Sequence, residues 1–192
     1  MLVADLHHFL ELPEDTPGPA RRLAEQLGDI VRAGTAGDVG EAWASALPCR
    51  RRPGKRACPG RMVVARPEPP GPIRWQCSAC RDGGVISNWQ DTPFDLRRRT
   101  PRLADPVRRF ALSDEVAAAL RDLLFLDAEV ERAVYGMRAE GRRLVLAVSD
   151  EDLEELIGSV AAEANAAPNR RRQRRLDAAL DALTDAQAAH HR

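Results

Sequence analysis

The sequence predicts an α+β protein, and three observations support this fold class. Apolar residues recur at helical spacing in the first and last thirds of the chain, for example at Leu23, Leu27 and Ile30. The region between them, residues 48–90, instead contains short β-branched or alternating segments separated by Pro and Gly. All four cysteines lie in that region. We therefore expect three short antiparallel strands between an N-terminal helical segment and a C-terminal, mainly helical part with a β-hairpin.

The N-terminal helical segment is expected to cover residues 1–47. Apolar residues at helical spacing over positions 2–10 predict a first helix. Pro-Gly-Pro at 17–19 opens a second helix, with Gly34 as its expected C-cap. A short third helical piece at 40–47 leads into the cysteine-bearing region.

The middle region, residues 48–90, is expected to form three strands at 61–66, 73–77 and 85–89. The Pro-rich segment at 67–72 is strong turn material between the first two strands. A Cys-Ser-Ala-Cys turn and a Gly-Gly pair separate the last two. A linker rich in Arg and Pro follows at 91–106.

The C-terminal region, residues 107–192, is expected to be mainly helical. Ser113 and Ser149 each precede an apolar stripe and have acidic residues directly after them, which is typical of helix N-caps. The segment at about 134–148 predicts a β-hairpin. A last helix is expected from about Asn169.

Metal binding is the strongest chemical prediction of the sequence. A CxxC spacing, present here at Cys77 and Cys80, lets a tight turn point both sulfurs at one metal ion. Cys49 and Cys58 supply a second pair, although eight residues separate them. Four protein ligands close the site, which is typical of a structural zinc ion rather than a catalytic one. We expect one zinc ion held by Cys49, Cys58, Cys77 and Cys80.

The order of these features resembles the zinc-ribbon fold group over residues 48–90. A cysteine pair, a strand, a hairpin, the CxxC turn and a further strand follow one another as in that group. The eight-residue gap between Cys49 and Cys58 departs from the usual pattern. The resemblance implies a three-stranded antiparallel zinc ribbon but no particular activity, since zinc ribbons serve many partners.

Three alternative interpretations of the cysteines remain open at this stage. The CxxC pair could be a redox dithiol, although no βαβ pattern surrounds it. Cys49 could be idle, with another residue or water completing the metal site. Four cysteines are also compatible with an iron–sulfur cluster.

A nucleic-acid-binding surface is predicted from the uneven distribution of charge. Residues 49–109 carry 15 basic and 5 acidic residues, a net charge of +10, whereas residues 111–168 carry 5 basic and 13 acidic residues, a net charge of −8. The cations could contact phosphates, and the aromatic faces of Trp75 and Trp89 could contact bases. The candidate nucleic-acid-binding residues are Arg50, Arg51, Arg52, Lys55, Arg56, Arg61 and Arg74. The alternative is that these cations are solvated or pair with the acidic region, and that the tryptophans form a small core.

A second cluster of arginines opens the last expected helix, between Arg170 and Arg175. Cations at a helix N-terminus oppose the helix dipole and cost stability. This placement indicates a partner, either nucleic acid or the acidic segment at 150–155.

The sequence contains no motif that indicates an enzyme. GxSxG, P-loop, GxGxxG and HExxH patterns are absent, and no small-molecule substrate is evident. The N-terminal residues do not resemble a secretory signal and no apolar run is long enough to span a membrane, so we expect a cytoplasmic protein. The Arg-rich, Lys-poor composition is typical of a GC-rich genome, and we expect a bacterial source. We expect a non-enzymatic binding module that contacts DNA or RNA through its basic loop. The alternative is a protein–protein adaptor in which zinc is purely structural.

Overall fold

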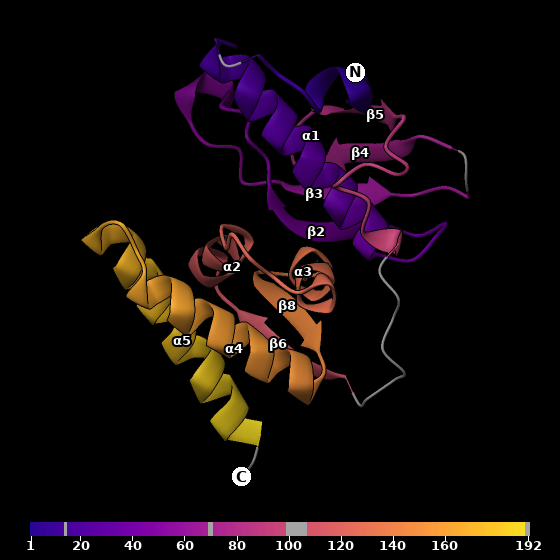
Figure 1. Ribbon diagram of the computed structural model, residues 1–192. Helices are drawn as coiled ribbons and strands as arrows, with labels where there is room; N and C mark the ends of the chain where they lie inside the picture. The colour runs from indigo at the N-terminus through magenta and orange to yellow at the C-terminus, as the bar shows by residue number, and fades with distance from the viewer. Residues whose placement is uncertain (14, 69–70, 99–106, 191–192) are drawn as a thin grey trace. The chain divides into compact units, whose positions relative to one another are not determined.

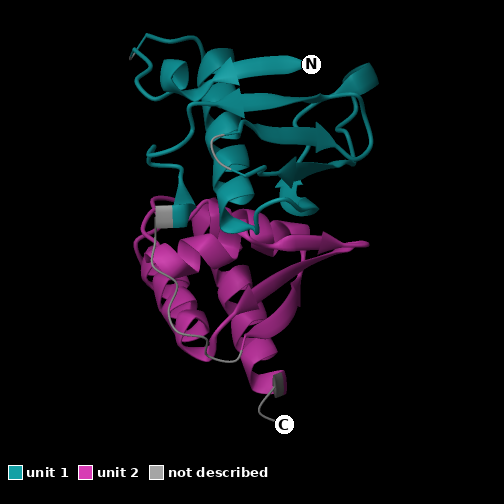
Figure 2. Cartoon of the chain, turned by 90° about the vertical axis from the view of Figure 1, so that its right-hand side faces the viewer, with its two compact units in different colours: residues 1–98 teal, residues 99–192 magenta. Residues whose placement is uncertain are grey.

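The computed structural model of the chain describes residues 1–13, 15–68, 71–98 and 107–190. The chain divides into two compact units, Met1–Arg98 and Arg99–Arg192 (Figure 2). The described residues form five α-helices and eight β-strands, which confirms the α+β class (Figure 1). Residues 99–106 of the expected linker lie outside the described residues.

Unit 1 is built on a five-stranded sheet. Its strands are β1 (Leu2–Asp5), β2 (Ala42–Pro48), β3 (Arg61–Ala65), β4 (Ile73–Cys77) and β5 (Gly83–Ser87). Their order across the sheet is β1-β5-β4-β3-β2. Strands β2 to β5 form an antiparallel meander, and β1 pairs in parallel with β5. The three strands expected from the sequence are therefore the centre of a larger sheet.

Helix α1 (Gly18–Ala36) packs on one face of this sheet (Figure 1). Its buried residues include Leu27, Ile30 and Val31, which follow one another at helical spacing. On β4, Ile73 and Trp75 are buried, and Ile73 lies against Gly34 of the helix. The helix and the alternating residues of the strands together form the hydrophobic core of unit 1.

Two helices expected in the first 47 residues are replaced by strands. Residues 2–10 form β1 and a short 3₁₀-helix, η1 (Leu6–Phe9), and residues 42–48 form β2. Pairing with β5 and β3 satisfies the backbone groups of these segments, which outweighs a local preference for helix.

The second expected helix is present as α1, but it continues past Gly34. Arg66 donates from its guanidinium group to the carbonyl oxygens of Gly34 and Gly37, at 3.2 and 2.9 Å. These bonds satisfy carbonyls at the helix C-terminus that have no partner within the helix. The C-cap residue is therefore Gly37 rather than Gly34, and the side chain of Arg66, the residue after β3, supplies the hydrogen bonds at this helix end.

The segment Asp91–Arg98, assigned to the linker from the sequence, packs within unit 1. Leu96 is fully buried, and the Asp95 carboxylate pairs with Arg97 at 2.7 Å. The backbone N–H of Leu96 donates to the hydroxyl of Thr35 in α1 at 3.1 Å. These contacts hold the end of unit 1 against its helix.

Unit 2 combines a three-stranded antiparallel sheet with four α-helices in its described residues. Its strands are β6 (Arg108–Leu112), β7 (Arg138–Glu140) and β8 (Arg143–Val148), in the order β7-β8-β6. Its helices are α2 (Asp114–Arg121), α3 (Ala128–Tyr135), α4 (Asp150–Asn165) and α5 (Arg170–His190). None of the helices in the described part of the chain is both long and apolar enough to cross a membrane.

The caps expected in unit 2 are confirmed. The hydroxyls of Ser113 and Ser149 accept hydrogen bonds from the backbone N–H groups of Val116 and Asp152. The expected hairpin is also present as β7 and β8, although its first strand begins at Arg138 rather than at position 134. Strand β6 was not expected from the sequence.

The parallel pairing of β1 with β5 gives the first testable prediction. A Cβ atom at Gly84 would lie 2.3 Å from the carbonyl oxygen of its register partner Leu2. Gly84→Val should therefore displace β1 and lower the free energy of unfolding by about 1–3 kcal/mol. Hydrogen exchange at Leu2–Asp5 should increase in this variant.

The control is Gly158→Ala in α4, where an added methyl group would meet no atom within 4 Å. This variant should leave exchange in β1 unchanged. Unaltered exchange at β1 in Gly84→Val would show that the strand is not held by this pairing.

Candidate metal centre

The four cysteines form one cluster in unit 1. The Sγ atoms of Cys49, Cys58, Cys77 and Cys80 all lie within 4.8 Å of one another. The sulfurs of Cys49 and Cys80 are 3.8 Å apart, and those of Cys58 and Cys77 are 3.6 Å apart. A tetrahedral site with metal–sulfur bonds of about 2.3 Å has its sulfurs about 3.8 Å apart. The cysteines are therefore compatible with a single metal ion.

Three parts of the unit 1 sheet deliver these sulfurs. Cys49 follows the last residue of β2, Cys58 precedes β3, and Cys77 ends β4. Cys80 belongs to the turn between β4 and β5. Three of the cysteines are buried within the hydrophobic core of unit 1, and Cys80 is partly buried against it. The metal site is thus continuous with the core.

Backbone hydrogen bonds hold the loops that carry the cysteines. The N–H of Cys49 donates to the carbonyl of Gly60 at 2.8 Å, and the N–H of Cys77 donates to that of Asp82 at 2.8 Å. The N–H of Cys58 donates to the carbonyl of Arg51 at 2.9 Å, which closes the eight-residue loop. The wide gap between the first two cysteines is therefore compatible with a compact site.

Gly60 allows two of these loops to approach each other closely. A Cβ atom at this position would lie 2.3 Å from the Cys77 sulfur and 2.9 Å from the Ala79 backbone nitrogen. Neither the ligand sulfur nor the backbone can move away without opening the cluster. The sequence Cys58-Pro59-Gly60 thus requires its glycine for packing against the second pair.

The thiols differ in how readily they ionise. Burial acts to raise the pKa of Cys77, but the N–H groups of Ala79 and Cys80 donate to its sulfur, and the balance lowers its pKa to about 7. Burial raises the pKa of Cys49 to about 12. A metal ion binds thiolates, so it must displace the Cys49 proton, and metal affinity should rise with pH.

Two of the candidate cations on the Cys49–Cys58 loop pair with acids of unit 1. The Arg50 guanidinium lies 3.2 Å from the carboxylate of Asp29 and also donates to the carbonyl of Arg22, both in α1. Arg51 lies 3.8 Å from Asp82, beside the CxxC turn. The expectation that these two residues are free to bind phosphate is therefore not supported by the structure.

The other candidate cations divide into two groups. Arg61 is half-buried and donates to the carbonyl of Ala46 at 2.9 Å. Four residues are exposed and make no ion pair within the described parts of the chain, namely Arg52, Lys55, Arg56 and Arg74. Arg74 alternates with the buried residues of β4 and so lies on the sheet face opposite α1.

Arg81 is a further exposed cation that the sequence analysis missed. It follows the ligand Cys80 directly and precedes Asp82, the partner of Arg51. Its position next to a CxxC cysteine is the signal that could have identified it. The metal site thus brings Arg81 close to the loop that begins at Cys49.

The tryptophans belong to the core rather than to an exposed surface. Trp75 is 5% exposed and Trp89 is fully buried. The indole N–H of Trp89 donates to the carbonyl of Gly71, and the Arg97 guanidinium stacks on its ring at 4.3 Å. Base stacking on these rings, one of the interpretations of the sequence, is excluded by this burial.

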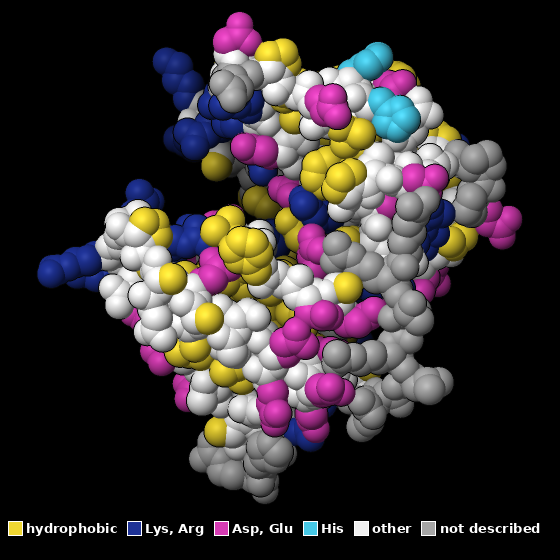
Figure 3. Space-filling view, viewed as in Figure 1, with side chains coloured by type: hydrophobic (Ala, Val, Ile, Leu, Met, Phe, Trp, Pro, Cys, Tyr) yellow, Lys and Arg dark blue, Asp and Glu magenta, His cyan; other side chains and the backbone are white. Residues whose placement is uncertain are grey.

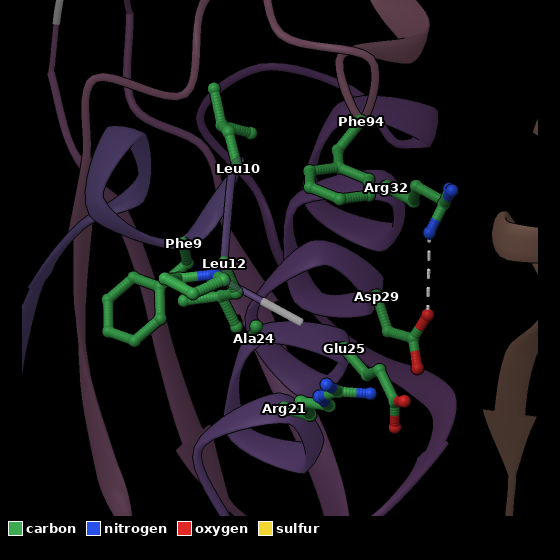
Figure 4. Close-up of a pocket in the computed structure, with 10 residues that line it drawn as sticks. Phe9, Leu10, Leu12, Arg21, Ala24, Glu25, Asp29, Arg32 and Phe94 are labelled. Carbon is green, nitrogen blue, oxygen red and sulfur yellow. Dashed lines mark ion pairs between the residues drawn. The ribbon is translucent and has the colours of Figure 1, made fainter. Parts of the chain in front are cut away.

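A hollow of about 690 Å³ lies beside α1, and none of the four cysteines is among the described residues that line it (Figure 4). Its apolar side is formed by Phe9, Leu12 and Phe94, and α1 contributes charged residues. Asp29 pairs with Arg32 in this hollow. Among the described residues that line it there is no Ser, Cys or His that could act as a nucleophile.

The close approach at Gly60 gives a prediction that leaves all four ligands in place. Gly60→Ala should weaken metal binding at least tenfold, because the added methyl group collides with the Cys77 sulfur. Competition with a chromophoric chelator measures this affinity. Gly158→Ala is again the matched control and should bind metal as the wild type does. Equal affinity in the two variants would contradict the geometry of the cluster.

Comparison of the chain with protein-family models, with curated proteins and with solved structures gives no match. The function must therefore be argued from the geometry of the site itself.

Proposed function

We propose that this chain is a non-enzymatic binding module whose unit 1 is stabilised by one structural zinc ion, and that the loop closed by the metal contacts DNA or RNA. The observation that carries the proposal is the cluster of four cysteine sulfurs within 4.8 Å of one another. Four thiolates complete a tetrahedron, so no position is left for a reacting water molecule.

The arrangement of the sulfurs favours zinc over the alternatives. Soft thiolate ligands in a tetrahedral set suit zinc, and a multi-iron cluster would need more space between the cysteines than 4.8 Å. A redox dithiol would need only Cys77 and Cys80. Here the Cys80 sulfur also lies 3.8 Å from that of Cys49, and the Cys77 sulfur lies 3.6 Å from that of Cys58. Such a site requires a reducing compartment, and we place the protein in the cytoplasm.

The zinc assignment gives a direct prediction. Purified protein should contain about one zinc ion per chain, because four thiolates coordinate one ion. Cys77→Ser should lose the metal and make unit 1 sensitive to protease, since an incomplete ligand set binds zinc far more weakly. Elemental analysis and limited proteolysis measure the two effects.

The control for this variant is Ala79→Ser, which adds a hydroxyl to an exposed position of the same turn. It should keep its zinc. A metal-free wild type with a protease-resistant unit 1, or iron in place of zinc, would refute the assignment.

The nucleic-acid contact is supported by the cations that remain unpaired near the metal. Arg52, Lys55 and Arg56 are exposed on the closed loop, and the loop tip has positive φ at Gly54 and Lys55, which projects it as a tight turn. Holding cations in a fixed geometry lowers the entropy cost of contacting several phosphates. We call Arg52, Lys55 and Arg56 the loop cations.

The loop cations give a prediction that distinguishes cations that contact phosphates from cations that pair with carboxylates of the chain. The triple variant Arg52→Ala/Lys55→Ala/Arg56→Ala should weaken oligonucleotide binding broadly across sequences. The slope of log K against log salt should fall by about 2–3, as expected for three lost phosphate contacts. Fluorescence anisotropy with oligonucleotides of mixed sequence, between 50 and 200 mM salt, measures both quantities.

Arg50→Ala/Arg51→Ala serves as the control, because both residues already pair with carboxylates of unit 1. It should flatten the salt dependence less than the triple variant. Zinc content should be unchanged in both. Oligonucleotide binding that is absent at low salt, or equal in all three proteins, would refute the nucleic-acid contact.

A protein–protein adaptor is the second candidate, favoured by the sheet face of unit 1 that lies opposite α1. Val3 on β1 is 70% exposed, and its register partner Val85 is only half-buried. Exposed apolar residues on a sheet are typical of protein contacts. Partner binding at this face should respond weakly to salt, which distinguishes it from phosphate binding.

A further inference from the structure

Unit 2 carries two oppositely charged patches at opposite ends of a helical hairpin. Helices α4 and α5 pack along each other and are joined by the short segment 166–169. The start of α4 and the start of α5 therefore lie at different ends, and the 16 residues of α4 separate them by about 24 Å. Within unit 2, basic side chains gather where α4 ends and α5 begins, and acidic ones gather at the other end (Figure 3). The arginines of α5 therefore cannot pair with residues 150–155 of the same chain.

The basic patch consists of Arg170, Arg171 and Arg174. All three are exposed, and no ion pair or hydrogen bond of their side chains is found within the described residues. The other arginines of this run behave differently. Arg172 pairs with Glu163 at 2.6 Å, and Arg175 pairs with Asp122 at 2.9 Å. Two arginines thus stabilise unit 2, and three are left for a partner.

A groove of about 950 Å³ adjoins the basic patch, between the start of α2 and the start of α5. Val116, Ala118 and Ala178 contribute its apolar lining. Asp114 and Glu115 line it too, at the N-terminus of α2, where acidic residues complement the helix dipole. A groove of this kind accepts a ridge such as a helix end that carries acidic side chains.

The acidic patch consists of Glu154 and Glu155 in the second turn of α4. Glu151 lies on the same face of the helix, but it already has an interaction within the chain. Glu154 is exposed and Glu155 is half-buried, and neither makes an ion pair within the described residues. The neighbouring carboxylates of Asp150 and Asp152 are instead held by Arg108 and Ser149. The chain itself therefore contains an acidic helix end that matches the basic groove.

We propose that unit 2 binds a second copy of this chain through a two-fold symmetric contact, in which the basic patch of each copy receives the acidic patch of the other. A two-fold axis perpendicular to the hairpin brings opposite ends together and forms both contacts at once. The partner carboxylates would offset the cost of three cations at the N-terminus of α5.

The chemistry of the groove favours a second copy over nucleic acid. No aromatic residue is found among the described residues that line the groove, so the groove offers no ring on which a base could stack. A protein helix can instead place apolar atoms against the lining and carboxylates against the arginines. Because the pairing charges are near the surface, salt should weaken the dimer markedly.

The test uses the full chain with its metal and measures the dimer dissociation constant by analytical ultracentrifugation at 50 and 500 mM NaCl. We expect a species of twice 21.1 kDa at low salt and at least tenfold weaker association at high salt. Arg171→Ala/Arg174→Ala should weaken the dimer at least tenfold. Arg142→Ala/Arg143→Ala removes the same charge from the exposed hairpin turn and should leave the dissociation constant unchanged.

Charge reversal gives the sharper test. Arg171→Glu/Arg174→Glu and Glu154→Arg/Glu155→Arg should each be monomeric, with unchanged circular dichroism, and an equimolar mixture should form a heterodimer. A monomeric wild type at low salt, or a mixture that stays monomeric, would overturn the proposal. A protein that is monomeric at every salt concentration, and that loses oligonucleotide binding in Arg171→Glu/Arg174→Glu, would also overturn it, because the basic patch would then bind nucleic acid. Because zinc and the loop cations are untouched, failure here leaves the proposed function standing.

Discussion

Closure of the four cysteine sulfurs around one point is the constraint on which unit 1 depends. It joins the end of β2, the start of β3 and the turn after β4. Eight residues separate Cys49 from Cys58, and strands β3 and β4 lie between Cys58 and the turn that carries Cys80. One helix covers one face of the sheet, so the apolar core is modest. Structural zinc sites contribute about 10–16 kcal/mol in small peptides, which is comparable to the whole stability of a domain. The metal would therefore contribute to folding and, by holding the Cys49–Cys58 loop, to the placement of its cations.

Local sequence signals predict those features that depend only on neighbouring residues, such as helix caps. Ser113 and Ser149 were recognised as caps because a cap needs only one side chain and the next turn of helix. Strands β1 and β2 were missed for the opposite reason. Their apolar residues fit a helical spacing, and the choice of strand is made by pairing with β5 and β3, whose residues lie 13 or more positions away along the chain. No single-sequence pattern contains that information.

The same division applies to the site. The four cysteines could be found from residue type and the CxxC spacing, because metal chemistry allows few alternatives. The basic residues could not be ranked in this way. Arg50 and Arg52 are two positions apart in one run of arginines, yet one pairs with Asp29 of α1 and the other faces solvent. The difference arises because Asp29, 21 residues before Arg50 in the sequence, lies next to it in the fold. Counting charges along the sequence does not reveal this proximity.

Arginine serves three physical roles in this chain, and only one of them indicates a partner. Arg66 satisfies carbonyls at the end of α1, and Arg172 closes an ion pair with Glu163. Both roles engage the guanidinium within its own unit and hold the fold together. Among the described arginines that are exposed without an ion pair, one group lies beside the metal loop and another at the start of α5. A free cation on a loop closed by metal is held in place at little cost, whereas one at a helix N-terminus destabilises its own helix. The second placement is therefore the stronger argument for a bound partner, since binding would offset a cost that solvent alone does not.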